Sequence, residues 1–89
     1  MANAVRESNL PTIIRAHVQS RLGESVEGLV EFQFDVLGSR SRPKLHYRRW
    51  LMPPGLWAAE PTEQRKFFAE LLPIAMDQAS GLLTAALGR

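Results

Sequence analysis

Residues 40–50, RSRPKLHYRRW, contain the densest run of side chains that could bind another molecule. Five basic residues surround a histidine and two aromatic rings, and no acidic residue occurs between Asp35 and Glu60. Basic groups bind phosphate oxygens and aromatic rings stack on exposed bases, while Arg and Trp together are typical of the centre of a protein–protein interface. The stretch therefore indicates a binding surface, for nucleic acid or for protein.

Acidic residues in the preceding stretch give this basic run a second interpretation. Between Arg21 and Arg40 the only charged residues are Glu24, Glu27, Glu31 and Asp35. Pairing of the two stretches across a loop centred on residues 40–41 places Asp35 opposite His46. It also places Arg48 diagonal to both Glu31 and Asp35. In this interpretation the basic residues of the strand are partly neutralised, through exposed pairs that each contribute less than about 1 kcal/mol.

Two sets of contact residues follow from these interpretations. For a protein partner, we expect the contacts to come from Arg40, Arg42, Arg48, Arg49, Trp50 and Trp57. For nucleic acid, the alternative, we expect phosphate contacts from the loop residues that have no assigned acidic neighbour, Arg40, Arg42 and Lys44. A basic hairpin can enter the major groove, but no helix-turn-helix, zinc-finger or RNA-recognition signature accompanies this one.

Catalytic and metal chemistry have little support in the sequence. The two histidines, His17 and His46, fall on different predicted elements without a metal-ligand spacing, and there is no cysteine. No Walker, Rossmann, G-x-S-x-G or H-E-x-x-H motif occurs. We therefore predict a protein that is not an enzyme and that has no cofactor and no metal site.

The first element expected to support this surface is a helix over residues 9–22. An apolar residue recurs at every fourth position, as Leu10, Ile14, Val18 and Leu22. Asn9 suits the N-cap, Pro11 suits the first turn, and Gly23 suits the end of the helix. Residues 1–8 are predicted to be a flexible tail.

A β-hairpin is predicted over residues 29–52. The stretch LVEFQFDV alternates between apolar and polar residues, so Val30, Phe32, Phe34 and Val36 share one face. GSRSRP has the composition of a hairpin loop, and KLHYRRWLM then forms the returning strand.

A second, long helix is predicted over residues 60–87. Glu60 or Thr62 suits the N-cap and Pro61 suits the first position. The apolar face is expected to contain Phe68, Leu72, Ala75, Ala79, Leu82 and Ala86. Pro73 interrupts the pattern, and we prefer one helix kinked there to two shorter helices.

These elements predict a small single-domain α+β protein of αββα order, with the hairpin packed against two helices. A lone two-stranded hairpin is marginally stable in water, and the second helix has more apolar residues than a small core can bury. We therefore expect a homodimer, with the two hairpins joined into a four-stranded sheet. The alternative is a monomer with a third strand near residues 55–59, GLWAA.

Length and charge narrow the class of protein further. The chain has 89 residues, enough for one domain, and a formal net charge of +2. Arg6 and Glu7 interrupt any apolar signal segment, and polar residues interrupt the apolar stretch at 71–87, so we expect a cytoplasmic protein without a membrane span. The use of Arg and Ala favours a bacterial or phage origin.

The functional expectation is a small, dimeric protein–protein interaction module that inhibits, adapts or chaperones a larger protein. The alternative is a nucleic-acid-binding regulator that uses the arginine-rich stretch at residues 40–49. Expected partners are a second copy and an unidentified protein, with nucleic acid as the alternative and without a membrane.

Overall fold

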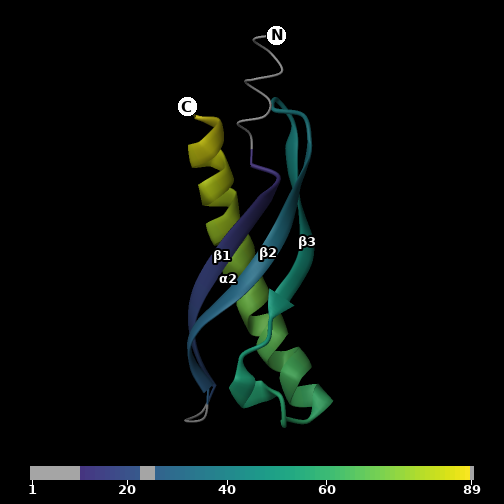
Figure 1. Cartoon of the computed structure of the whole chain (residues 1–89), viewed down its shortest axis with the longest axis vertical. Coiled ribbons are helices and arrows are strands. Elements are labelled where there is room, and N and C mark those ends of the chain that lie inside the picture. The colour runs from purple at the N-terminus through teal and green to yellow at the C-terminus, as the bar shows by residue number, and fades with distance from the viewer. Residues whose placement is uncertain (1–10, 23–25, 89) are drawn as a thin grey trace.

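A sheet of three strands lies against one long helix in the computed structural model, which describes residues 11–22 and 26–88 (Figure 1). The strands are β1 (Ile13–Leu22), β2 (Val26–Gly38) and β3 (Pro43–Leu51), antiparallel and in the order β1-β2-β3. A short 3-10 helix, η1 (Pro54–Leu56), precedes the long helix α2 (Pro61–Leu87). The α+β class, the hairpin and the C-terminal helix of the prediction are confirmed.

The predicted helix over residues 9–22 is wrong, because residues 13–22 form β1. The described order is therefore β-β-β-α and not αββα. A spacing of four residues is close to one helical turn, but it is also even, so it keeps side chains on one face of a strand. Two β-branched residues of this segment, Ile14 and Val18, point into the core and favour the strand. Residues 9 and 10 and the predicted tail at 1–8 lie outside the described residues.

The third strand that completes the sheet is thus β1, from the N-terminal side of the hairpin. The alternative location near residues 55–59 is also wrong, because Pro54–Leu56 form η1 and the chain then turns towards α2. With three strands and a helix over one face, the sheet meets the usual requirement for stability that a lone hairpin would miss.

The register between β2 and β3 agrees with the prediction near the loop and departs from it further along. Residues 34–36 face residues 45–47, as expected. A β-bulge beside Gln33 then adds one residue, Arg48, to β3, so that Gln33 faces Arg49. Bulges of this kind increase the local twist of a sheet and change where side chains point.

A tight turn joins β2 to β3. The Arg42 backbone N–H donates to the Ser39 carbonyl oxygen at 3.1 Å and to its hydroxyl oxygen at 3.2 Å. Gly38, just before the turn, has a φ of +83°, and a Cβ there would collide with the Arg42 carbonyl oxygen. The turn therefore requires glycine at this position.

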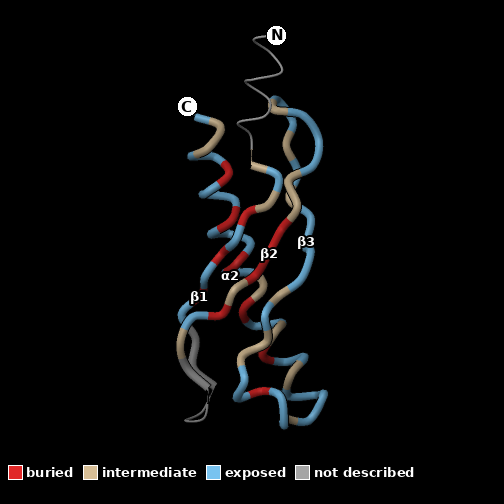
Figure 2. Tube along the Cα trace, viewed as in Figure 1, coloured by how far each residue is buried: buried red, intermediate tan, exposed pale blue. Residues whose placement is uncertain are grey.

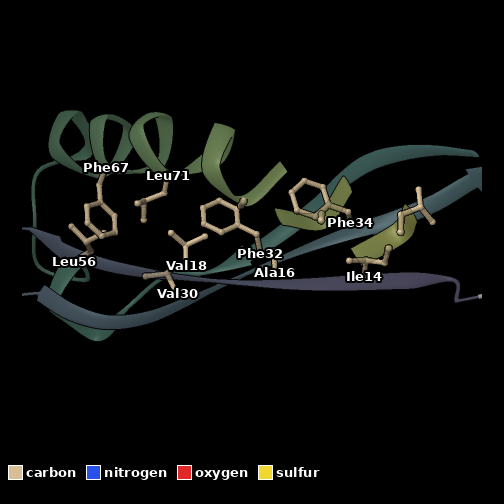
Figure 3. Packing of buried hydrophobic residues seen from close by; sticks show 12 residues of the cluster. Ile14, Ala16, Val18, Val30, Phe32, Phe34, Leu56, Phe67 and Leu71 are labelled. Carbon is tan, nitrogen blue, oxygen red and sulfur yellow. The ribbon is translucent and has the colours of Figure 1, made fainter. Parts of the chain in front are cut away.

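The core lies between one face of the sheet and α2, as the buried segments of Figure 2 show. Figure 3 shows its side chains, which are Ile14, Ala16, Val18, Val30, Phe32, Phe34, Leu56, Phe67, Leu71, Ala75, Ala79 and Leu83. The 27 residues of α2 span about 40 Å, and the 13 residues of β2 span about 43 Å. The helix can therefore cover the sheet along its whole length.

The buried face of α2 is displaced by one residue from the predicted face at several positions. Its buried residues recur strictly every four positions, from Phe67 to Leu83, whereas the prediction alternated steps of three and four. Each step of four turns the contact by about 40° around a helix of 3.6 residues per turn. Because a sheet twists, a helix that follows it needs this rotating contact line. Leu82, predicted to be in the core, is therefore exposed.

The predicted start and continuity of α2 are confirmed. Glu60 is the N-cap and Pro61 the first helical residue, although the Glu60 side chain makes no capping hydrogen bond. The helix continues through Pro73, so one helix is correct and two are not. Pro73 is exposed, so its ring and its missing N–H face away from the core.

Candidate functional site

The helix leaves one strand only partly covered. α2 packs chiefly against β1 and also contacts β2, whereas β3 lies to one side of it (Figure 1). The helix-side residues of β3 are consequently only partly buried, and Tyr47 is 37% exposed. On this face of β3, partly exposed apolar side chains lie next to a sheet edge that pairs with no other described strand.

Aromatic rings join β3 to the first half of α2. The centroid of the Phe68 ring lies 5.2 Å from that of Trp50, 5.4 Å from that of Tyr47 and 5.7 Å from that of Phe32. The Trp50 and Tyr47 rings meet Phe68 edge to face, an arrangement that aromatic pairs favour. Burial raises the pKa of Tyr47 above its ordinary value of 10.0, against a smaller opposite effect of a backbone hydrogen bond with Trp50.

A pocket of about 280 Å³ opens beside these rings and is named here the β3–α2 pocket. Its lining residues are Trp50, Met52, Gln64, Arg65 and Phe68. Gln64 is held in place because its Nε2 donates to the Leu56 carbonyl oxygen at 2.8 Å, whereas Arg65 is exposed at the edge. The volume lies just below the usual range of small-molecule sites, and it suits one large apolar side chain.

Trp57, predicted to contact a partner, lies close to this pocket. It is 68% exposed, and its Nε1 donates to the Met52 carbonyl oxygen at 3.3 Å. Because the Met52 side chain lines the pocket together with Trp50, the two predicted tryptophans border the same residue.

The opposite face of the sheet is open and mainly polar, with three exposed leucines, Leu29, Leu37 and Leu51. Two predicted contact arginines point to it: Arg48 Nη1 lies 3.1 Å from an Asp35 oxygen, and Arg49 Nε donates to Gln33 Oε1 at 3.0 Å. The predicted neutralisation of Asp35 by Arg48 is confirmed. Arg49 is bound to an amide and not to an acid, so its charge is not neutralised by this contact.

Glu31, on the same open face, is neutralised from β1. Arg15 Nε lies 3.5 Å and His17 Nε2 3.0 Å from its carboxylate, and Gln33 Nε2 donates to it at 2.6 Å. The hydrogen bond from Gln33, then His17 and Arg15, hold the pKa of Glu31 below its ordinary 4.5, against the opposing effect of partial burial. The prediction that Arg48 lies diagonal to both acids is therefore wrong for Glu31. The β-bulge shifts the register of β3, and residues of β1 contact Glu31 instead.

The loop residues of the alternative interpretation have no acidic partner within the described part of the chain. Among the described residues, no carboxylate lies within ion-pair distance of Arg40, Arg42 or Lys44. Arg42 and Lys44 are exposed and Arg40 is half-buried. The loop is thus a basic tip at the end of the hairpin.

The six predicted contact residues do not form one patch. Arg48 and Arg49 lie on the open face, Arg40 and Arg42 in the loop, and Trp50 in the aromatic cluster on the helix side. The pocket also contains α2 residues that the sequence analysis did not select, Arg65 and Phe68. The one indication of these residues in the sequence is the adjacent pair Phe67 and Phe68. Which of the two phenylalanines faces β3 depends on the rotation of α2, and the sequence does not determine this rotation.

The two edges of the sheet differ in their backbone partners. At β1, the His17 N–H donates to Gln78 Oε1 at 2.7 Å, and Gln78 Nε2 donates to the His17 carbonyl oxygen at 2.9 Å. The Gln78 side chain of α2 thus occupies the middle of the β1 edge, as a neighbouring strand would. Within the described part of the chain, no strand and no such side-chain bond covers the outer edge of β3.

The described residues contain no group of three or more His, Asp or Glu residues that could bind a metal ion. Of the helices described, none combines the length and the apolar character needed to cross a membrane.

No protein-family model matches the chain, and neither a curated protein nor a solved structure matches it. The functional assignment therefore rests on the side chains themselves and on the contrast between the two sheet edges.

Proposed function

We propose that the chain is a small protein–protein interaction module whose binding site is the β3–α2 pocket together with the outer edge of β3. The observation that carries the proposal is the position of an apolar pocket, lined by Trp50, Met52 and Phe68, beside an edge strand. Edge strands offer unpaired N–H and C=O groups to another chain. In strand addition, such main-chain bonds supply affinity and side-chain pockets supply specificity.

The contrast between the edges supports β3 as the docking edge. Gln78 occupies the centre of the β1 edge through two hydrogen bonds to His17. A partner strand at β1 would have to displace both bonds, whereas a strand at β3 meets no such competitor among the described residues. We therefore propose one docking edge per molecule.

The size of the site suits a modest affinity. Burying one large apolar side chain contributes about 2 kcal/mol, and each main-chain hydrogen bond adds about 1 kcal/mol. The cost of ordering the partner segment reduces this sum, so the affinity of a short strand lies in the weak range. This range fits a module that inhibits, adapts or chaperones a larger protein by binding a segment of it.

Selection from a displayed library of random peptides tests this proposal. Peptides that bind the wild type should bind Met52→Gln at least several-fold more weakly, since the exchange keeps the length of the side chain and makes the pocket polar. Met76→Gln is the matched control, because Met76 is exposed and does not line the pocket. Failure to select any peptide, or equal binding to Met52→Gln, would contradict the proposal.

The homodimer predicted from the sequence stays a prediction. One of its two premises, a lone hairpin, no longer holds, because β1 completes the sheet. The other premise persists, since Ile74, Met76 and Leu82 of α2 are exposed. Joined hairpins would place two basic β3 strands side by side, which like charges oppose.

Nucleic-acid binding is the second candidate, favoured by the basic tip. Arg40, Arg42 and Lys44 have no acidic partner among the described residues. Contacts of this kind to phosphates release counterions, so affinity must fall steeply with salt. Fluorescence anisotropy with duplex and single-stranded DNA at about 50 and about 200 mM salt tests it. Salt-insensitive binding, or binding unchanged when all three residues are alanine, rules this candidate out.

A further inference from the structure

We infer that the partner segment is an extended strand in which acidic residues alternate with apolar ones, and that it adds to the outer edge of β3. The inference rests on the proposed function, because it names the chemistry of the segment that the β3–α2 pocket accepts. It follows from the different composition of the two faces of β3 and from the charges left without partners there.

The two faces of β3 present different side chains to a neighbouring strand. Leu45, Tyr47 and Trp50 face the helix side, where the pocket lies. Lys44 and His46, as well as the two arginines of the bulge, belong to the open face. Side chains of an added strand alternate in the same way and lie beside these two rows. Every second residue of the partner therefore meets apolar surface, and the residues between meet basic groups.

The β-bulge raises the density of positive charge on the open face. Residues that follow one another in a regular strand point to opposite faces. Arg48 and Arg49 instead both bond to residues of the open face, Asp35 and Gln33 respectively. The extra residue of the bulge thus adds a second guanidinium to the row that an incoming strand would meet.

The described residues neutralise only part of the charge along β3. Asp35 pairs with Arg48, while neither Lys44 nor Arg49 has a carboxylate within ion-pair distance among the described residues. Arg65 adds a further exposed charge at the pocket. Opposite charges on adjacent strands are favourable and like charges are unfavourable. Acidic residues are therefore selected in the partner strand, and a second copy of β3 is disfavoured.

The length of β3 makes strand addition distinguishable from docking in the pocket alone. Lys44 is six residues from Trp50, a separation of about 20 Å along an extended strand. A peptide that only inserts a side chain into the pocket senses Arg65 but not Lys44. A strand that follows β3 senses both.

Sequencing the peptides selected from a random twelve-residue library tests the inference, since twelve extended residues span about 40 Å and exceed the length of β3. We expect selected peptides to have Asp or Glu at alternate positions, with apolar residues between. Lys44→Glu should weaken their binding about twofold to fivefold, the range of exposed ion pairs. Lys66→Glu is the matched control, because Lys66 is exposed on α2 and does not line the pocket.

Two results would overturn the inference and leave the proposed function standing: selected peptides that depend on Met52 but lack acids, or selected peptides that are insensitive to Lys44→Glu. The absence of any peptide that depends on Met52 would overturn both. Duplex DNA that binds at 50 mM salt more tightly than the selected peptides, and loses binding in Lys44→Glu, would assign the basic row to phosphates and overturn the inference.

Discussion

Glu31 lies on the central strand, β2, and links side chains of β1 and β3 on the open face. It accepts a hydrogen bond from Gln33 and contacts Arg15 and His17 of β1. Gln33 is itself buried, and its side-chain oxygen Oε1 accepts a hydrogen bond from Arg49 Nε of β3. One carboxylate thus helps to fix the side chains of three strands on a face that no helix covers. Its ionisation should contribute to stability.

Glu31→Gln tests this contribution through its pH dependence. The pKa of Glu31 in the folded protein lies below its ordinary 4.5, so its charge stabilises the fold fully above about pH 4.5. That stability is lost as the pH falls through the lowered pKa. At pH 7 we expect urea unfolding to give a loss of up to about 1 kcal/mol, since the pairs are partly exposed. The difference from wild type should shrink only below pH 4.5.

Glu70→Gln is the matched control, because Glu70 is an exposed residue of α2 that forms no ion pair with another described residue. Its stability should follow that of the wild type across the pH range. A Glu31→Gln effect that was as large at pH 3 as at pH 7 would show that the side chain acts through packing and not through its charge.

Replacing glycine by alanine should change the free energy of unfolding in opposite directions at Gly38 and at Gly81. Gly38→Ala places a Cβ against the Arg42 carbonyl oxygen at a φ of +83°, and we expect a loss of about 1 to 3 kcal/mol. Gly81→Ala adds a Cβ that meets nothing within 4 Å in an exposed helical position, and should gain about 0.5 to 1 kcal/mol. Chemical unfolding of both variants measures the two signs, and equal signs would contradict the described turn.

At the scale of elements, β1 is held from both sides. β2 pairs with it along its whole length, and Gln78 of α2 bonds to the His17 backbone on the other side. The helix lies close to the strand here because Ala16, Ala75 and Ala79 are small and fully buried. A short distance between helix and strand lets a glutamine side chain reach the strand edge. This contact also removes one edge of the sheet from pairing with other chains.

Gln78→Leu should open the β1 edge at one point. The leucine keeps a similar size but neither donates nor accepts, so both bonds to His17 are lost. We expect the His17 amide to exchange its hydrogen with solvent at least tenfold faster, from the loss of about 1.4 kcal/mol of local protection. Amides of Phe32 and Phe34 in the central strand should be unaffected. Unchanged exchange at His17 would show that Gln78 does not protect this edge.

The elements differ in how far the sequence determines them. The strict alternation from Val30 to Val36 has only one regular interpretation, so β2 and its register near the loop could be predicted. The spacing of four residues between Ile14 and Val18 fits a strand and a helix equally, so β1 could not. The pocket could not be predicted either, because it depends on the rotation of α2, which brings Phe68 next to Trp50.

At the scale of the whole molecule, charge is separated between the sheet and the helix. Residues 13–51, which include the three strands, contain seven basic residues and four acids, a net charge of +3. Residues 60–87 contain four acids and two basic side chains, a net charge of −2. The small overall charge of +2 for the chain therefore conceals a basic side and an acidic side. Charge patterns of this kind steer association more than they stabilise a fold.

This separation predicts opposite salt effects on two kinds of association. Binding of an acidic strand at β3 should weaken with salt, because the attraction is screened. Pairing of β3 with its own copy is opposed by Lys44 and Arg49, so salt should favour it. The Debye length falls from about 10 Å at 0.1 M to about 3 Å at 1 M, and over this range the repulsion between exposed charges on adjacent strands is largely lost.

Light scattering as a function of salt measures the second effect. If copies associate through β3, we expect a larger average mass at 1 M salt than at 0.1 M salt. Lys44→Glu replaces one repulsive charge by an attractive one, so it should associate more than the wild type at 0.1 M and respond less to salt. Lys66→Glu, with the same change in net charge on α2, should behave as the wild type does. A wild-type dimer at 0.1 M that weakened with salt would locate the interface away from β3 and make the exposed residues Ile74 and Leu82 of α2 the next positions to substitute.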